Sequence, residues 1–338
     1  MNSKERVIAR INNRPVDRIP NLNILMFFTA REMGISYAEY CQDYRKLVHG
    51  NITCTRKYGI DAVSTMSDPM RECADMGMEI LFPAEGVPHE KEFLIKEKSD
   101  LLKLKPVLPA DGRRMTDRVL AVDLFKKEVG NELPIIGWVE GSFAIAADLR
   151  GVNNFMMDIY EDPDFTVDLL EICLEQAILF AYAQIAAGAD FIGVGDAIAS
   201  VAGPFAYQEL ALQYEERLLK AIREAGGMTK LHICGNTTPF LELLPAQYCD
   251  ILDVDWMVPL DRAAELHGHI TCINGNYDPV AVLLQGSVQD VKDAVNACAS
   301  VGGKKYTCSA GCEVPKHTPP ANLMAVHEAL TNIKEIEN

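Results

Sequence analysis

The chain has 338 residues, with 32 Lys and Arg against 48 Asp and Glu, so its formal net charge is −16. Apolar residues make up 49% and charged residues 24% of the sequence. This is the balance of a globular protein, and it excludes a disordered chain. The acidic excess argues against binding to nucleic acid or to an anionic membrane, because both present negative charge that calls for a basic protein face.

Ten cysteines are spread along the chain, too sparsely for a small disulfide scaffold. The first ten residues lack the apolar core of a signal peptide. The most apolar stretch, from Ile178 to Gly195, is interrupted by Gln184 and Asp190 and is a poor membrane span. We therefore expect a cytoplasmic protein whose reduced thiols are free to bind metal. The sequence leaves the oligomeric state open, a homo-oligomer included.

Short runs rich in Val, Ile and aromatic residues recur along the chain and predict strands. The expected strands are Ile19–Phe27, Asp61–Ser67, Pro134–Glu140, Asp190–Asp196, Thr229–Gly235, Ile251–Trp256, Ile270–Asn274 and Lys305–Ala310.

Helical patterns lie between the later strands. Pro163–Ala187 carries an apolar stripe after a plausible N-cap at Asp162. The other expected helices are Phe205–Ala225, Val288–Val301 and Pro320–Ile336. The first two of these three end at Gly pairs, which are typical helix stops.

Eight strands alternating with helices predict an α/β fold, a (β/α)₈ TIM barrel formed by residues 1–338 as a single domain. The long stretch Met70–Val129 would add extra helices between the second and third strands. A doubly wound open sheet is the alternative, but no Gly-rich phosphate loop supports it. Gly193-Val194-Gly195 is only a two-glycine match to such a loop.

In a barrel of this kind the active site lies at the carboxyl ends of the strands. His232 and Cys234 are two residues apart on the expected fifth strand and would share one face. Cys312 follows the last strand, in a turn opened by Gly311. His232, Cys234 and Cys312 then form a zinc site with one open position. Cys308 is the rival third ligand.

Carboxylates at other strand ends are candidates for a fourth ligand or for acid and base catalysis. Asp196, Asp255 and Asp68 are the preferred candidates, with Asp253 and Glu140 as further ones. Flexible and aromatic side chains near the same ends suit an apolar or aromatic substrate. The expected substrate pocket is formed by Phe27, Met66, Phe143, Trp256 and Asn274.

Several segments together resemble the uroporphyrinogen decarboxylase superfamily, over nearly the whole chain. They are Asn13-Arg14-Pro15-Val16-Asp17-Arg18-Ile19-Pro20, Gly188-Ala189-Asp190, Leu231-His232-Ile233-Cys234-Gly235-Asn236-Thr237, Asp253-Val254-Asp255-Trp256, Gly275-Asn276-Tyr277-Asp278-Pro279, Gly311-Cys312-Glu313-Val314-Pro315, and Thr318-Pro319-Pro320 with Asn322. The His-x-Cys pair with the late Gly-Cys pair resembles the zinc-dependent, corrinoid-linked methyltransferase branch.

The decarboxylase itself is the competing member of the superfamily. Asp68 matches the position of its key aspartate, but its Arg-rich segment after the first strand is replaced here by 26–33, with Arg31 alone. Its late Gly-His-Gly segment is replaced by Gly311-Cys312-Glu313. A substrate with many carboxylates would be poorly compensated here, and we reject this activity.

The resemblance implies that Zn²⁺ activates one partner of a methyl transfer while a separate corrinoid protein supplies the cobalt. The apolar pocket leads us to expect an O-methyl donor such as a methoxylated aromatic, as in O-demethylase systems. Asp196 or Asp255 would then protonate the leaving group. The alternatives are methyl transfer from methylcobamide to a thiol of the coenzyme M type and, without turnover, a zinc- and thiol-binding barrel.

Overall fold

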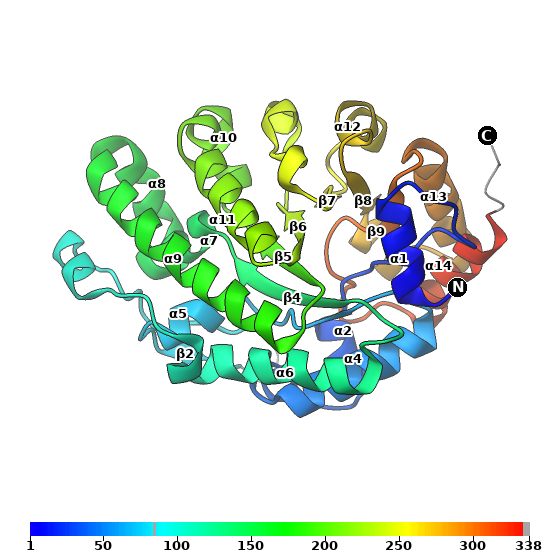
Figure 1. Ribbon diagram of the computed structural model, residues 1–338, viewed down its shortest axis with the longest axis horizontal. Coiled ribbons are helices and arrows are strands. Elements are labelled where there is room, and N and C mark those ends of the chain that lie inside the picture. The colour runs from blue at the N-terminus through cyan, green and yellow to red at the C-terminus, as the bar shows by residue number, and fades with distance from the viewer. Residues whose placement is uncertain (84–85, 334–338) are drawn as a thin grey trace.

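The computed structural model of the protein describes residues 1–83 and 86–333. Its framework is a curled parallel sheet of seven strands in the order β1-β4-β5-β6-β7-β8-β9, surrounded by helices (Figure 1). The strands are β1 (Val63–Ser64), β4 (Ile135–Glu140), β5 (Phe191–Gly195), β6 (Met228–His232), β7 (Ile251–Asp253), β8 (Cys272–Tyr277) and β9 (Tyr306–Ala310). A separate antiparallel pair is formed by β2 (Ile80–Leu81) and β3 (His89–Glu90).

Helices follow most of the strands and cover the outside of the curled sheet. The α-helices are α1 (Ser3–Ile11), α2 (Phe27–Glu32), α3 (Tyr37–Gln42), α4 (Tyr44–Tyr58), α5 (Arg71–Asp75), α6 (Arg113–Val129), α7 (Ser142–Arg150), α8 (Val152–Glu161), α9 (Pro163–Ala187), α10 (Ala199–Ala206), α11 (Leu212–Glu224), α12 (Leu260–His267), α13 (Val288–Val301) and α14 (Pro320–Asn332). Short 3₁₀ or π segments are η1 (Lys98–Lys103), η2 (Pro109–Asp111), η3 (Tyr207–Ala211), η4 (Thr238–Leu243), η5 (Ala246–Tyr248) and η6 (Pro279–Leu284).

An irregular segment, instead of an eighth strand, closes the ring. Asn21 forms a parallel bridge with Cys308 of β9, and the backbone N–H of Leu22 donates to the Cys308 carbonyl at 2.8 Å. On the other side the N–H of Asp61, just before β1, donates to the Asn21 carbonyl at 2.7 Å. The expected α/β barrel is confirmed. The predicted first strand, Ile19–Phe27, is wrong, because among these residues only Asn21 pairs with the sheet.

The reason lies in the residue types of that segment. Pro20 has no N–H to donate to a ladder, and Asn21 and Asn23 are poor strand formers. The Asn21 side chain accepts from Asn23 Nδ2 at 2.7 Å, which ties the segment to itself. Phe27, expected at the strand end, begins α2 instead.

The six later strands lie where the sequence predicts them, to within a few residues at each end. Three differences affect the functional region. β7 ends at Asp253, so Asp255 and Trp256 lie in the following loop and not on the expected strand Ile251–Trp256. β6 ends at His232, so Cys234 lies in the following loop and not on the expected strand Thr229–Gly235. β8 continues to Tyr277, beyond the expected end of Ile270–Asn274.

The expected helices Pro163–Ala187 and Val288–Val301 are confirmed as α9 and α13, and Asp162 caps α9 by accepting from Phe165 N–H at 3.2 Å. The expected helix Phe205–Ala225 is interrupted: α10 ends at Ala206, and a π turn leads into α11. The expected helix Pro320–Ile336 is observed to Asn332, and its last residues, 334–336, lie outside the described range.

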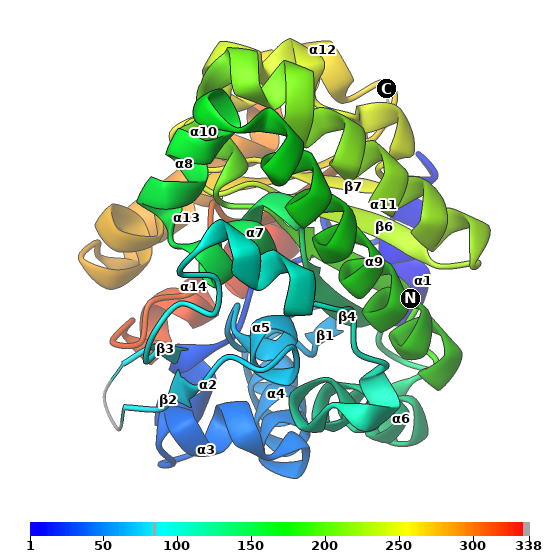
Figure 2. The same ribbon diagram turned by 90° about the vertical axis from the view of Figure 1, so that its left-hand side faces the viewer.

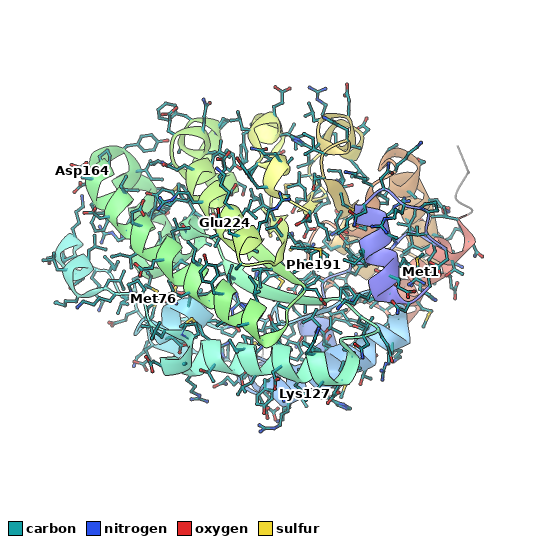
Figure 3. All side chains as sticks on the ribbon, in the orientation of Figure 1. Met1, Met76, Lys127, Asp164, Phe191 and Glu224 are labelled. Atoms are coloured by element: carbon teal, nitrogen blue, oxygen red, sulfur yellow. The ribbon has the colours of Figure 1, made fainter. Side chains whose placement is uncertain are left out.

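The stretch Met70–Val129 lies outside the sheet, as expected, and holds α5, the β2–β3 pair and α6 (Figure 2). α9 is long enough and apolar enough to cross a membrane, with a mean hydropathy of 1.4, but half of that window is buried in the protein. It packs against α6, α7, α8 and α11. Side chains fill the space between these helices and the sheet (Figure 3), so α9 is a helix of the core.

Candidate metal centre

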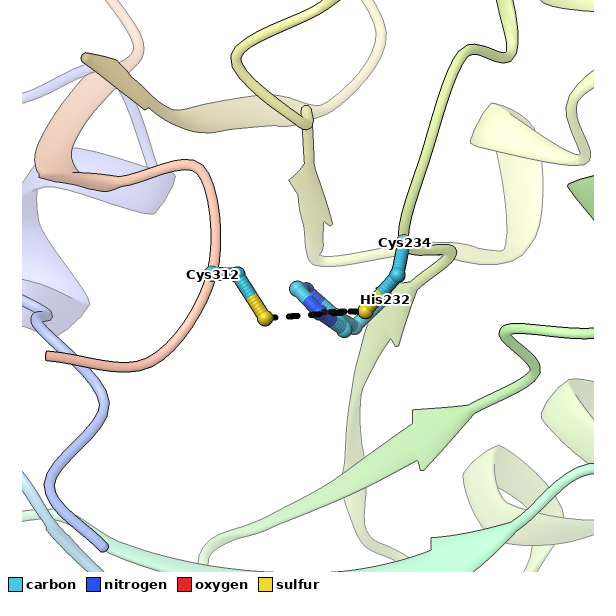
Figure 4. Close-up of side chains that lie close together, drawn as sticks. All are labelled: His232, Cys234 and Cys312. Carbon is cyan, nitrogen blue, oxygen red and sulfur yellow. Dashed lines mark hydrogen bonds between the residues drawn. The ribbon is translucent and has the colours of Figure 1, made fainter. Parts of the chain in front are cut away.

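Three side chains from two distant parts of the chain meet at the carboxyl end of the sheet. One ligand atom each from His232, Cys234 and Cys312 lies within 4.8 Å of the other two. The Cys234 and Cys312 Sγ atoms are 3.7 Å apart, and His232 Nε2 is 2.9 Å from Cys234 Sγ. Figure 4 shows Cys312 reaching across from the loop after β9 toward the pair from the end of β6.

A buried carboxylate holds the His232 ring. Asp253 Oδ2 lies 3.0 Å from His232 Nδ1, which makes Nδ1 the protonated nitrogen and leaves Nε2 free to face the sulfurs. Asp253 Oδ1 accepts from Lys230 Nζ and from Asn274 Nδ2, the latter at 2.8 Å. The strand register places these residues together, because β7 lies between β6 and β8. Lys230 was not among the predicted site residues, although its spacing of two residues from His232 predicts the same face of the strand.

Cys234 is placed by the turn that follows β6. Gly235 has φ +91°, a left-handed conformation that favours glycine. Its N–H donates to Asp255 Oδ2 at 2.9 Å, while Asp255 Oδ1 accepts from Met257 N–H at 3.0 Å. The Asp255 carboxylate therefore ties the loop after β6 to the loop after β7 and sets the position of Cys234.

Cys312 depends on the glycine before it. A Cβ on Gly311 would lie 2.2 Å from the backbone nitrogen of Trp256, so only glycine fits this close approach of two loops. The Gly311 N–H donates to the Tyr277 carbonyl at 3.0 Å. Cys308, the rival ligand, is fully buried in β9 and is not part of the cluster.

The electrostatics of the cluster favour a bound cation. A hydrogen bond from the Cys234 thiol lowers the pKa of Cys312 to about 4, and His232 adds to this against the effect of burial. The Cys312 sulfur is therefore a thiolate at neutral pH, the form that binds metal. Burial lowers the pKa of His232, but Cys234 and Asp253 outweigh it and raise that pKa overall, so a metal bound at Nε2 would take the place of a proton.

The spacing of the two sulfurs also suits zinc. Tetrahedral zinc with sulfur ligands at about 2.3 Å places two sulfurs about 3.8 Å apart. The observed separation of the two Sγ atoms is 3.7 Å. Two sulfurs and one imidazole nitrogen form a ligand set typical of zinc, and three protein ligands leave a fourth position for a reactant.

Asp196 lies beside the cluster through the backbone. It follows β5, and its N–H donates to the His232 carbonyl at 3.0 Å. Asp196 Oδ1 accepts from Ala144 N–H at 2.8 Å, at the start of α7. Its Oδ2 is buried and has no hydrogen-bond partner among the described residues. Burial raises the pKa of Asp196 to about 7, although the backbone N–H groups of Ala144 and Phe143 oppose this.

Asp68 is already paired. Its Oδ2 accepts from Arg114 Nη2 and from Ser67 Oγ, at 2.7 and 2.8 Å. Burial raises the pKa of Asp68, but the charges of Arg114 and Arg71 outweigh it and hold that pKa below its usual range. In this structure the side chain is one member of a buried ion pair.

The expected pocket residues are distributed over several environments. Phe27 is half-buried and stacks on Tyr37 with ring centroids 4.0 Å apart. Met66 is also half-buried, in the segment after β1. Trp256 lies at the mouth and is 44% exposed.

The two remaining pocket residues are buried. Phe143 is fully buried at the start of α7 and packs edge to face on Phe155, 5.2 Å away. Asn274 lies beneath the cluster, where it donates to Asp253 and also to Ser309 Oγ at 3.0 Å. Its position supports the Asp253 carboxylate.

Comparisons with known proteins identify the family of the chain. The family described as uroporphyrinogen decarboxylase (URO-D) matches residues 2–333. A methylcobamide:CoM methyltransferase from Methanosarcina acetivorans is 30% identical, with 98% of each chain covered. A uroporphyrinogen decarboxylase from Carboxydothermus hydrogenoformans is 26% identical over 89% of this chain and 87% of its own.

Solved structures support the same assignment of the fold. A methyltransferase from Methanosarcina mazei superposes with a TM-score of 0.87 at 24% identity, covering 97% of this chain and 98% of its own. A putative vitamin-B12 independent methionine synthase from Listeria monocytogenes has a TM-score of 0.53 at 13% identity, covering 94% and 97%. The chain belongs to the uroporphyrinogen decarboxylase family and is one of its corrinoid-linked methyltransferases.

Proposed function

We propose that the protein binds zinc through His232, Cys234 and Cys312 and methylates a thiol with a methyl group taken from the cobalt of a corrinoid protein. The observation that carries this proposal is the meeting of the three ligand atoms within 4.8 Å. Support comes from the methylcobamide:CoM methyltransferase that is similar over 98% of both chains. Zinc held at this point would lower the pKa of a bound thiol and so supply a nucleophile at neutral pH.

The chain's own residues prepare the site for this transfer. Asp253 fixes the His232 ring, and Asp255 and Gly311 fix the two cysteine loops. The incoming thiol must lose its proton, and we propose Asp196 as the base, because its Oδ2 is free and its pKa is about 7. Its carboxylate lies against Gly141 and Ala144 at the start of α7, so a water molecule would carry the proton from the thiol to it. The sulfur then forms a bond to the methyl carbon, while the cobalt–carbon bond breaks and both of its electrons remain on cobalt.

Demethylation of a methoxylated aromatic is the second candidate. The exposed Trp256 and Met257 at the mouth favour it, since they could contact an aromatic substrate. The comparisons support the thiol better, because a relative similar over its whole length is named for coenzyme M.

We further propose that the corrinoid protein docks over the carboxyl end of the sheet. The loops there expose apolar side chains: Val201 and Phe205 of α10, Trp256 and Met257 after β7, and Val280 after β8. Phe205 is the most exposed of them, at 68%. The three ligands lie at this end of the sheet, so a cobalt atom would approach the fourth zinc position from this side. We place the protein in the cytoplasm, with its thiols reduced.

Purified, zinc-loaded protein should change the visible absorbance of methylcobalamin when a thiol is added, as the cobalt loses its methyl group. A parallel panel of methoxyarenes with cob(I)alamin tests the second candidate. Zinc binding without any change of the corrinoid spectrum in either panel would leave a metal-binding barrel without turnover and would refute the proposal.

Replacement of Phe205 by Asp tests the docking surface. It should raise the KM for the corrinoid protein about tenfold or more, because it puts a charge into an apolar contact. Turnover with free methylcobalamin should not change. Leu102→Asp is the matched control, since Leu102 is 85% exposed on η1, in the Met70–Val129 insertion. Equal effects of both substitutions would rule out this docking face.

A further inference from the structure

A second polar site lies on the inner face of the sheet beside His232. In the strand register Glu140 of β4 pairs with Gly195 of β5, and Gly195 pairs with His232 of β6. Paired residues of a parallel sheet point their side chains to the same face of the sheet. Glu140 and His232 therefore both point into the barrel, on either side of Gly195. Trp138 lies one inward position below Glu140, opposite Gly193.

The glycine leaves room that two polar atoms occupy. A Cβ on Gly195 would lie 2.9 Å from Glu140 Oε2 and 3.1 Å from Trp138 Nε1. The carboxylate and the indole N–H therefore lie side by side above this backbone position. The Trp138 ring centroid is 6.0 Å from that of His232, which places the pair within one small molecule's reach of the metal ligands.

Both groups have hydrogen-bonding capacity to spare. Trp138 Nε1 is buried and has no partner among the described residues. Buried indole N–H groups ordinarily find an acceptor, so this one is best explained by a ligand or water that completes it. Glu140 uses Oε1 to accept from Arg71 Nη2. No hydrogen bond of Glu140 Oε2 is found in the described part of the chain.

The charges around this pair disfavour an anion. Arg71 is fully buried and is flanked by two carboxylates, with Glu140 on Nη2 and Glu72 Oε2 at 3.6 Å from Nε. Its positive charge is shared between these two carboxyls, and its Nε and Nη1 have no hydrogen-bond partner among the described residues. Burial raises the pKa of both Glu140 and Glu72, so a sulfonate or carboxylate placed against Glu140 would be a third acidic group beside a single buried cation.

We propose that Trp138 and Glu140 form a subsite for a neutral hydroxyl group on the substrate thiol, which accepts from the indole N–H and donates to the carboxylate. This inference rests on the proposed function, since the same thiol's sulfur occupies the fourth zinc position. The preferred methyl acceptor is therefore a short hydroxylated thiol and not a sulfonated one.

Three short thiols test whether the subsite prefers a hydroxyl, an apolar or a sulfonate group: mercaptoethanol, propanethiol and mercaptoethanesulfonate. Their dissociation constants are measured on the protein loaded with Co²⁺ in place of zinc, from the thiolate-to-cobalt absorption, and their KM values from methylcobalamin turnover. Mercaptoethanol should bind about tenfold more tightly than either of the others, because only it satisfies both groups.

Trp138→Phe and Gly195→Ala should abolish the advantage of mercaptoethanol over propanethiol while metal content is retained. Glu140→Gln should improve binding of the sulfonate about tenfold, since it removes the opposing carboxylate. Glu132→Gln, an exposed carboxylate before the other end of β4, is the matched control and should change none of these constants. If Glu140→Gln does not fold, the other two variants still decide the matter.

The outcomes distinguish a failure of the subsite from a failure of the proposed methyltransferase function. Equal binding of all three thiols, or a preference for the sulfonate in the unaltered protein, would overturn the subsite and leave the methyltransferase proposal standing. If no thiol binds the Co²⁺-loaded protein and none is methylated, the proposed function fails and the subsite falls with it.

Discussion

Asp253 determines which ring nitrogen of His232 can bind a metal. Its carboxylate is buried, and burial alone would raise its pKa, but the charge of Lys230 and the hydrogen bond with His232 lower that pKa to about 2. The carboxylate is therefore ionised at every physiological pH and always accepts from Nδ1. Such a carboxylate fixes the tautomer and orientation of the imidazole and makes it a better ligand.

Replacing Asp253 with Asn should weaken zinc binding about 10- to 100-fold, because the amide cannot hold the ring as the carboxylate does. The zinc dissociation constant, measured by competition with a chelator, tests this. Asp250→Asn is the control: Asp250 lies at the opposite end of β7 and accepts from Thr229 N–H at 2.8 Å. Unchanged zinc affinity in Asp253→Asn would show that His232 does not depend on this carboxylate.

Cys312→Ala should lose bound zinc and keep its fold, because the remaining two ligands are too few for a stable site. Metal analysis of the purified variant, with circular dichroism as the check on folding, measures both. Cys308→Ala should retain zinc, since Cys308 is buried within β9. The reverse result, with zinc lost only in Cys308→Ala, would make Cys308 the third ligand.

At the scale of the elements, the two cysteine loops are held by backbone contacts as much as by side chains. The loop after β9 lies so close to the loop after β7 that a Cβ at Gly311 would be 2.2 Å from Trp256 N. The loop after β6 is tied to the same region by Asp255. The loop after β7, which supplies no metal ligand, therefore sets the distance between Cys234 and Cys312.

Gly311→Ala should displace the Cys312 loop and weaken zinc binding although all three ligands remain. We expect a loss of about tenfold or more, since a strained ligand position costs affinity directly. Gly303→Ala is the control, because a Cβ there meets nothing within 4 Å. Its own left-handed φ of +81° should cost some stability but no zinc affinity.

The regular elements could be predicted from the sequence because their apolar residues repeat with the period of a strand or a helix. α9 and α13 are clear cases, with a capping residue before the apolar stripe. The segment around Asn21 could not be predicted, since its place in the ring depends on Cys308 and Asp61, which are distant in sequence.

The site was predictable to a similar degree. The residue types and strand ends indicate His232, Cys234 and Cys312, and the structure brings them together. Lys230 and Trp138 were not predicted, and Glu140 was only a further candidate, because their importance comes from neighbours on other strands: Asp253 for Lys230, and Gly195 for the pair. A single sequence shows no such neighbours.

For the molecule as a whole, Asp61 joins the two ends of the sheet. It is fully buried, and Arg6 and Arg18 both donate to it, at 2.7 and 2.6 Å. It also accepts from Asn21 N–H at 2.8 Å. The carboxylate thus holds α1, the irregular segment and β1 together, at the end of the barrel opposite the metal ligands.

Asp61→Asn should lower the free energy of unfolding by about 3–5 kcal/mol, because it leaves buried guanidinium groups without their partner. Urea denaturation measures the loss, and zinc content should remain that of the unaltered protein. Asp17→Asn, which alters a half-exposed partner of Arg6, should cost about 1 kcal/mol or less. Similar losses in both variants would contradict the central role of Asp61.

The closure at Asn21 also has a consequence for biosynthesis. A segment near the start of the chain must wait for Cys308, close to its end, before the ring is complete. Until Cys308 has been synthesised, Asn21 lacks the residue with which it forms this bridge. The cluster that joins His232 to Cys312 can form only after that, so a truncated product would be unable to retain the ion.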